Sequence, residues 1–298
     1  MKSNLSSKNP ALIKISVVIF ILLLAAYIPL KIHISSEGET EPVAETVSFD
    51  IIITRNLSRC IYPGGRCAAG IENTREMIRA GEKGESLLIL DYLEIDPAKL
   101  EEGSRPKQLP VDRLKRIGYH AIAPVIAGES TAEFLSSPRT VFQLPLPLVS
   151  ANIIPEQDRN HNLRQWVCGD ISGAVRGKDE YRDIRIGIFS VSRMDSIEDS
   201  YSRFNSYNII NPKIAALEVI NRLNREGCHL IIAVCGAGFN EDLRSVPGID
   251  LILEGAGKTR IRSNAENYMV SFGEDSSTAN RFRVLFSEDS LKVIPLRS

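Results

Sequence analysis

The chain of 298 residues is 43% hydrophobic and 24% charged, which suits one α/β domain or two small ones and excludes a mainly disordered chain. Its formal net charge of -1 provides no overall field that would favour nucleic acid, so we expect no nucleic-acid partner.

The first predicted element is an apolar segment bounded by lysines. Residues 15–30 carry no charge, and Lys14 and Lys31 stand at their two ends. The apolar residues 11–13 lengthen the run, and the flanking lysines can snorkel, so the segment approaches the roughly 17–25 residues that cross a bilayer. We therefore predict a transmembrane anchor over residues 11–32.

The orientation of this anchor follows from its flanks. Lysines in residues 1–10 predict a short cytoplasmic stub under the positive-inside rule. The rest of this single-pass chain would then lie outside a bacterial-type inner membrane, in the periplasm or outside the cell. A cleaved signal peptide is the alternative, although the bulky Tyr27 and Ile28 follow Ala25-Ala26, where cleavage needs small residues.

The folded body begins after a linker. Residues 33–48 are polar and acidic with one proline and predict that linker, which leaves residues 49–298 for the body. In the body, apolar runs of strand length alternate with helix-like stretches, a pattern that indicates a sheet covered on both faces. Strands are predicted within 49–56, 86–95, 110–128, 144–154, 183–192, 229–234 and 248–255, and helices over 70–81, early in 110–128 and over 211–228.

Two segments of this body have further signals. The helix at 211–228 has Asn211 as its expected cap and Pro212 in its first turn. The alternating segment 267–296 predicts closing antiparallel strands.

A glycine loop near the C-terminus has the appearance of a phosphate site. Leu251–Arg260 ends in Gly257-Lys258-Thr259, like the end of a P-loop. A P-loop needs a glycine five residues before Gly257, where this chain has Ile252, and no amphipathic helix follows. We therefore expect a tight turn at a strand end and no nucleoside triphosphate site.

The histidines and acids give no metal cluster by spacing alone. None of the four histidines belongs to an HxH, HxxxH or Cys/His motif, so we expect partly exposed or capping side chains at His33, His120, His161 and His229. Asp91 and Glu94 stand at the carboxyl end of a predicted strand, where α/β sheets place ligands. This pair is a candidate for holding a cation or for acid/base work.

The body contains an odd number of cysteines, five, so at least one is free or pairs between chains. Cys60 and Cys67 bracket a turn-forming "IYPGGR" and are a plausible local disulfide. Cys228 and Cys235 would stand roughly 23 Å apart along one strand and cannot bridge each other. Cys235 directly precedes a glycine loop, which suits either a reactive thiol or a small buried filler.

The order of these pieces over residues 49–298 resembles the calcineurin-like metallophosphoesterases, in particular the catalytic domain of periplasmic 5′-nucleotidases. The similarity is strongest in "LPLPLVSANI", "DIRIGIFSVS", residues 211–243, "VPGIDLILEGAGKT" and "NYMVSFGE". The resemblance implies an α/β fold, a four-layer α/β/β/α sandwich with metal ligands at the strand ends.

The metal-ligand motifs of that family are degenerate in this chain. Asn56 and Ser58 stand where the family has its D-x-H motif, and Glu94 stands where it has the last Asp of "LDAGD". Ile126 and Ala127 stand in place of an Asn-His pair, and Gly236 in place of a lone His. Ala256 and Lys258 occupy the positions of the final His-x-His. Every histidine ligand is gone, so the two cations of such a centre would lack donors. Only Asn56, Asp91 and Glu94 keep some ligand capacity, and we expect no cofactor.

Three functions remain open. The first is a membrane-anchored module, outside the cytoplasm, that has lost the two-metal hydrolase site and binds or organises an unknown protein partner. The second is a divergent phosphoesterase that hydrolyses nucleotides or other phosphate esters with a divalent metal at an atypical site. The third is a thiol redox protein that uses Cys60 and Cys67. Lys258, next to glycine-loop amides, is a candidate anion-binding residue.

Overall fold

From Thr46 onward, the described part of the molecule lies within one compact unit. The computed structural model describes residues 45–57, 67–81, 86–95, 111–126, 145–155, 163–192, 207–256, 259–263, 267–273 and 279–296. The unit covers Thr46–Ser298, and its first strand begins two residues before the predicted boundary at 49. In the described ranges no helix is long and apolar enough to cross a membrane, and the predicted anchor at 11–32 lies outside them.

Strands dominate the unit. The helices are α3 (Cys67–Gly81), α4 (Val111–Lys115), α6 (Pro212–Arg225) and α7 (Asn240–Arg244). The strands are β1 (Val47–Thr54), β2 (Leu87–Ile95), β3 (Ala121–Ile126), β4 (Leu148–Val149), β5 (Ile153–Pro155), β6 (Leu163–Arg164), β7 (Val167–Val175), β8 (Tyr181–Val191), β9 (Tyr207–Ile209), β10 (Leu230–Gly236), β11 (Leu251–Gly255), β12 (Arg260–Ser263), β13 (Tyr268–Phe272), β14 (Ala279–Ser287) and β15 (Ser290–Leu296).

Hydrogen bonds join 13 of these strands into one mixed sheet, which confirms the predicted α/β class with a large sheet. The main path runs β12-β13-β11-β10-β8-β7-β1-β2-β3-β4-β6, and β14 pairs with β1 and β15. Two parallel blocks, β1-β2-β3 and β8-β10-β11-β13, are joined through β7, which pairs antiparallel with β8 and, over only two residues, with β1. The predicted antiparallel ending is correct for β14 and β15, while β13 pairs antiparallel with β12 on one side and parallel with β11 on the other.

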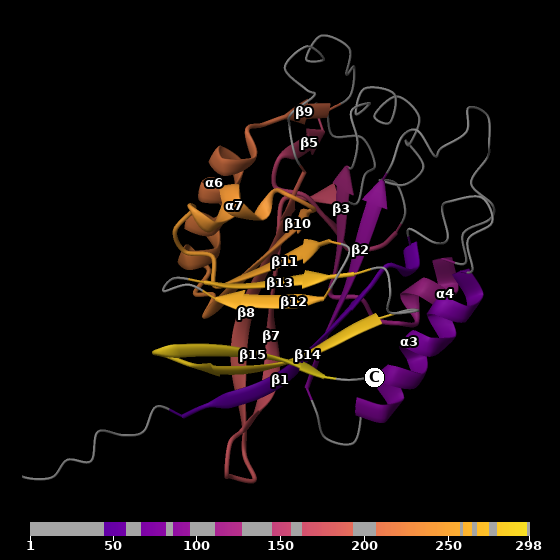
Figure 1. Ribbon diagram of the computed structural model, residues 1–298, viewed down its shortest axis with the longest axis vertical. Coiled ribbons are helices and arrows are strands. Elements are labelled where there is room, and N and C mark those ends of the chain that lie inside the picture. Colours follow the sequence, from indigo (N-terminus) through magenta and orange to yellow (C-terminus); the bar gives the residue numbers. More distant parts are fainter. Residues whose placement is uncertain are drawn as a thin grey trace, which may run out of the picture. The chain divides into compact units, whose positions relative to one another are not determined.

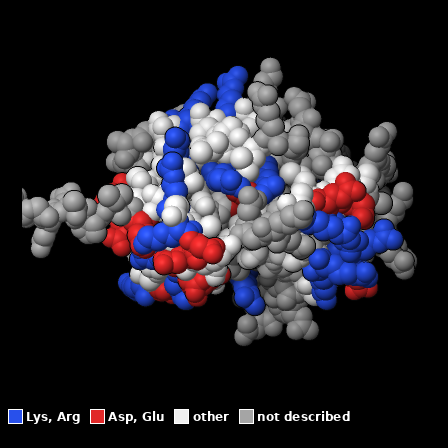
Figure 2. Space-filling view, turned by 90° about the horizontal axis from the view of Figure 1, so that it is seen from below, with Lys and Arg blue, Asp and Glu red and all other residues white. Residues whose placement is uncertain are grey.

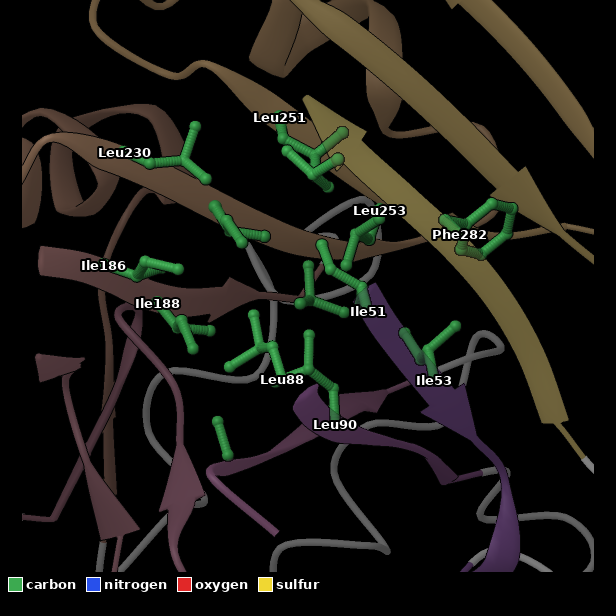
Figure 3. Packing of buried hydrophobic residues seen from close by; sticks show 14 of the residues in the cluster. Ile51, Ile53, Leu88, Leu90, Ile186, Ile188, Leu230, Leu251, Leu253 and Phe282 are labelled. Carbon is green, nitrogen blue, oxygen red and sulfur yellow. The ribbon is translucent and has the colours of Figure 1, made fainter. Parts of the chain in front are cut away.

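The two blocks face each other across an apolar core, as Figure 3 shows. Alternate residues of β1 and β2, including Ile51 and Leu88, point toward Ile186, Leu230 and Leu253 of the other block. Because successive side chains of a strand point to opposite faces, the residues between them point outward. These strands are therefore buried on both faces, which explains their uninterrupted apolar runs.

Helices cover the outer faces (Figure 1). On one side α6 and α7 pack on the outward residues of β8, β10 and β11, such as Phe189, Ile231 and Ile252. Helix α6 begins as predicted, because the Asn211 side chain accepts hydrogen bonds from the backbone N–H groups of Lys213 and Ile214. Figure 1 shows α3 and α4 on the opposite side of the sheet.

Candidate functional site

The carboxyl ends of the two parallel blocks meet at one place. Tyr92 of β2 is 1% exposed and lies in the same core as Val125 of β3 and Phe272 of β13. Its ring meets that of Phe272 edge-on, with centroids 5.3 Å apart. The strands whose ends carry Glu94, Gly236 and Ala256 therefore converge, as the resemblance implied, and we call this the strand-end site.

The Tyr92 ring fills the centre of the strand-end site. A Cβ atom added at Gly255 would lie 2.3 Å from Cζ of Tyr92, and one at Gly236 would lie 2.9 Å from Cγ1 of Val125 and 3.7 Å from the Tyr92 hydroxyl oxygen. Any side chain at Gly255 would collide with the ring. The two glycines therefore leave the space that the aromatic side chain occupies, and a histidine at Gly236 would have to displace Val125.

A fixed positive charge stands beside this ring. Nη2 of Arg55 lies 2.5 Å from Oε2 of Glu94, and the guanidinium carbon is 4.9 Å from the Tyr92 ring centroid. The Arg55 side chain is 14% exposed and that of Glu94 29%. Glu94, the carboxylate at the position of a family metal ligand, thus already has a cation as its partner.

The second acid of β2 points the other way. Asp91 is fully buried and accepts hydrogen bonds from Oγ1 of Thr54 at 2.5 Å and from the backbone N–H groups of Asn56 at 2.8 Å and Leu57 at 3.3 Å. Residues three apart on a strand lie on opposite faces, so Asp91 and Glu94 do not form the expected pair of carboxylates. Asp91 instead holds the chain in its turn after β1.

Asn56 is turned into the same buried polar cluster. Its Nδ2 donates to Oγ1 of Thr74 at 2.7 Å and to the hydroxyl of Tyr119 at 2.9 Å. Thr74 in turn donates to the carbonyl of Gly70 at 2.8 Å, which ties the cluster to α3. Among the described residues, Oδ1 of Asn56 has no hydrogen-bond partner. The side chain thus joins β1 to α3 and does not face Glu94.

Burial raises the pKa values of Asp91 and Tyr92 on the two faces of β2. It raises the pKa of Asp91 from its usual 3.8 to about 6, and the hydrogen bonds from Thr54, Asn56 and Leu57 oppose part of that rise. Burial, together with the nearby charge of Glu94, also raises the pKa of Tyr92. The Tyr92 hydroxyl therefore remains protonated near neutral pH and is no general base there.

A third acid, Glu254, forms hydrogen bonds at the ends of β10 and β11. Glu254 accepts a hydrogen bond from the backbone N–H of Gly238 at 2.8 Å and another from the Ser271 hydroxyl at 2.7 Å. The N–H of Ala256 donates to the carbonyls of Glu254 and Phe272, each at 3.0 Å. These bonds hold the turn at Gly238 and the end of β11, while Gly257 and Lys258, where the tight turn is expected, lie outside the described residues.

The remaining predicted site residues fall largely outside the described part of the chain. Ser58, Cys60, Ala127 and Lys258 lie outside it. Ile126 ends β3 and Cys67 begins α3, and the described part includes neither side chain. The proposed Cys60–Cys67 disulfide and the anion-binding role of Lys258 therefore stay predictions.

The described histidines have backbone roles. Nδ1 of His120 accepts a hydrogen bond from the N–H of Ile89 at 3.1 Å, and Nδ1 of His229 accepts one from the N–H of Arg185 at 2.9 Å. Both fit the capping role expected from the sequence, while His33 and His161 lie outside the described residues. Cys235 is fully buried, and burial raises the pKa of its thiol, so it is a core residue and not a nucleophile.

Sequence reasoning missed the residues that fill the strand-end site. Arg55, Tyr92 and Phe272 were not candidates, because none is a metal ligand or a nucleophile. A usable signal was present in "LDYLE": Tyr92 stands where the family's "LDAGD" has alanine. A bulky residue next to a ligand position indicates that the space around that position has been filled.

The surface carries both signs of charge. In Figure 2, Lys and Arg side chains and Asp and Glu side chains are interspersed on the face shown. Exposed pairs include Arg182 with Glu288 at 3.8 Å and Arg185 with Asp170 at 3.5 Å. The face in Figure 2 therefore lacks a uniformly basic field.

The described residues do not fit a two-metal centre. Within the described ranges, no group of three or more His, Cys, Asp and Glu side chains could hold a metal ion. Of the surviving candidates, Glu94 is paired with Arg55, while Asp91 and Asn56 face the other side of the sheet. The cations of such a centre would meet a guanidinium and an aromatic ring instead of imidazoles.

Several solved structures have a similar fold. The NAD nucleotidase NadN of Haemophilus influenzae gives a TM-score of 0.55 at 14% identity, over 85% of this chain and 50% of its own. The 5′-nucleotidase precursor of Thermus thermophilus gives 0.55 at 15% identity, over 84% and 54%. The calcineurin-like phosphoesterase YfkN of Bacillus subtilis gives 0.55 at 14% identity, over 84% and 90%.

The chain spans about half the length of the two nucleotidases and most of the YfkN structure. By sequence alone it matches no family model and no curated protein. At this level of identity the similarity establishes the fold and leaves the activity open. The strand order, the converging strand ends and these structures together show that the chain has the fold of the calcineurin-like metallophosphoesterases and 5′-nucleotidases.

Proposed function

We propose that this chain is a metallophosphoesterase-fold module that has lost the two-metal hydrolase centre and acts as a binding or scaffold protein. We further propose that residues 11–32 anchor it in a membrane and that its body works outside the cytoplasm. The observation that carries the loss of the metal centre is the Arg55–Glu94 pair beside the Tyr92 ring.

The electrostatics of that pair oppose metal binding. Like charges repel, so the Arg55 guanidinium disfavours a divalent cation at Glu94, although solvent screens part of this repulsion at the partly exposed carboxylate. Arg55 cannot lose its proton to relieve the repulsion. A cation at Glu94 would have to displace the guanidinium and find ligands elsewhere, although the family's histidine positions here hold residues such as Gly236 and Ala256.

Elemental analysis tests the loss of the metal centre. The purified protein would be incubated with Mn, Zn or Fe, dialysed and analysed for metal, and then assayed for hydrolysis of nucleotides and phosphodiesters. We expect no stoichiometric metal and no metal-dependent hydrolysis. Metal at one or more ions per chain that is lost in Glu94→Ala but retained in Asp170→Ala, a change at an exposed carboxylate, would establish the divergent phosphoesterase instead.

Two further experiments test location and partner. Deletion of residues 1–32 should move the protein from the membrane fraction to the soluble fraction, and protease added outside the cytoplasm should degrade the body of the intact chain. Chemical crosslinking in the native membrane, followed by mass spectrometry, should recover a specific protein partner. A chain that stays in the soluble fraction with residues 1–32 present would overturn the anchor.

A further inference from the structure

Two cysteines that are far apart in the sequence meet on the outer face of the sheet. Cys168 lies in β7 and Cys228 between α6 and β10, and their Sγ atoms are 3.0 Å apart. This distance is within about 1 Å of a disulfide bond length of 2.03–2.05 Å. Both side chains are half-buried and pack against the core beneath α6, so a small thiol reagent can approach them from the surface.

The backbone explains why the two thiols meet. Strand β8 separates β7 from β10, and Cys168 pairs across from Gly187 of β8. At Gly187 a Cβ atom would lie 2.7 Å from Leu223 of α6, so this glycine lets the end of α6 approach the sheet. Gly227, with φ of +75°, turns the chain after α6, and the N–H of Cys228 donates to the Leu223 carbonyl at 3.1 Å.

Contacts around the thiols hold both segments in place. Nε1 of Trp166, two residues before Cys168, donates to Glu226, two residues before Cys228, at 3.1 Å. The guanidinium of Arg222 lies 5.1 Å from the centroid of the Trp166 ring. These contacts join the same two segments as the cysteines do, so oxidation would require only a small movement of the sulfur atoms.

We propose that Cys168 and Cys228 form a disulfide that joins β7 to the connection between α6 and β10. The oxidant would be a disulfide, either of a small thiol or of a thiol–disulfide oxidoreductase. One cysteine thiolate attacks this disulfide and releases one thiol, and the other cysteine then attacks the mixed disulfide and releases the second. One disulfide is thereby reduced to two thiols while two cysteine thiols become one disulfide, with no net change in protons.

This pairing also accounts for the odd number of cysteines. Cys235 is fully buried, and burial raises the pKa of its thiol, so it is the described cysteine that remains reduced. Cys60 and Cys67 stay available for the local disulfide predicted from their spacing. The inference does not depend on the proposed loss of the metal centre, because the cysteine pair lies on the other face of the β8–β10 block.

A direct test is mass spectrometry of the oxidised chain. The purified full-length protein would be treated with oxidised glutathione, alkylated and digested without reduction. We expect a linked peptide pair that contains Cys168 and Cys228 and that disappears after reduction. Alkylation of both cysteines as free thiols after this treatment would overturn the proposal, as would their exclusive pairing with other cysteines.

Matched variants give a second readout. The oxidised wild type should unfold roughly 8–15 °C higher than the reduced protein, because the cross-link closes a loop of about 60 residues. In a Cys60→Ser background, which removes the predicted local disulfide and should retain most of this difference, Cys168→Ser and Cys228→Ser should each abolish it. The single tryptophan, Trp166, should fluoresce more strongly after reduction, since a neighbouring disulfide quenches it. A thermal shift that persists in Cys168→Ser would assign it to another pair.

Discussion

The two faces of β2 at its carboxyl end have different chemistry. On the outward face, Asp91 accepts hydrogen bonds from Thr54 and from two backbone N–H groups and so holds the turn after β1. On the inward face, Tyr92 fills the strand-end site and Glu94 pairs with Arg55. The outward face thus carries the hydrogen bonds that position the loop, while an aromatic ring and an ion pair occupy the inward face.

The comparison shows that the two faces are stabilised by different interactions. Loss of a buried hydrogen-bond acceptor such as Asp91 leaves unsatisfied donors and costs stability. On the inward face the Tyr92 ring instead contributes van der Waals contacts, because it fills the space beside Gly236 and Gly255. The outward face is therefore held mainly by hydrogen bonds and the inward face mainly by packing.

The largest expected effect concerns the ring on the inward face. Tyr92→Ala should lower the free energy of unfolding by about 3–5 kcal/mol, because it leaves a cavity between the two blocks of the sheet. Urea denaturation measures this loss. Tyr181→Ala is the matched control, since Tyr181 is 57% exposed and its removal should change stability by only about 0.5 kcal/mol. Equal losses in both variants would show that Tyr92 is not a packing residue.

On the outward face, the proton bound by Asp91 should make the free energy of unfolding depend on pH, by about 3 kcal/mol in total. Burial raises the pKa of Asp91 from 3.8 to about 6, so the folded chain binds this proton more tightly than the unfolded chain. The resulting stabilisation is fully present below about pH 4 and is lost as the pH rises through 6. Relative to Asp91→Asn, the wild type should therefore lose about 2–2.5 kcal/mol between pH 4 and pH 7. Parallel stability curves for the two proteins would contradict this.

Gly255 tests the contact between the two blocks. Gly255→Ala should cost roughly 1–3 kcal/mol, since its Cβ atom would lie 2.3 Å from the Tyr92 ring. Gly169→Ala is the control, because a Cβ atom there has no neighbour within 4 Å. Most of the Gly255→Ala penalty should disappear in a Tyr92→Ala background, and a double-mutant cycle measures the coupling. Additive losses would mean that the ring and the glycine do not share the space.

The smallest expected effect concerns the ion pair. Because Glu94 is partly exposed, the Arg55–Glu94 interaction should contribute only about 0.5–1 kcal/mol and should weaken at high salt. A double-mutant cycle with Arg55→Met and Glu94→Gln at low and high ionic strength measures it. A coupling of several kcal/mol that is insensitive to salt would indicate a pair more thoroughly desolvated than its exposure suggests.

Much of the framework could be predicted from the sequence. The strands β1, β2, β8, β10 and β11 and the helix α6 have local signals, because their apolar period or capping residues depend only on near neighbours. Strand direction has no such local signal: β13 pairs antiparallel with β12 but parallel with β11, and its own sequence does not distinguish the two neighbours. Strand β7 was also missed, because much of its surface is polar or partly exposed.

The sequence by itself determined the mixed α/β class, because apolar period and capping residues follow from residue identity and spacing along the chain. Tertiary structure alone decided that Asp91 and Glu94 face apart, that Tyr92 fills the space beside Gly236 and Gly255, and that Cys168 meets Cys228. Each of these depends on which strands become neighbours. That choice is made by burial across the whole sheet, and no local pattern encodes it.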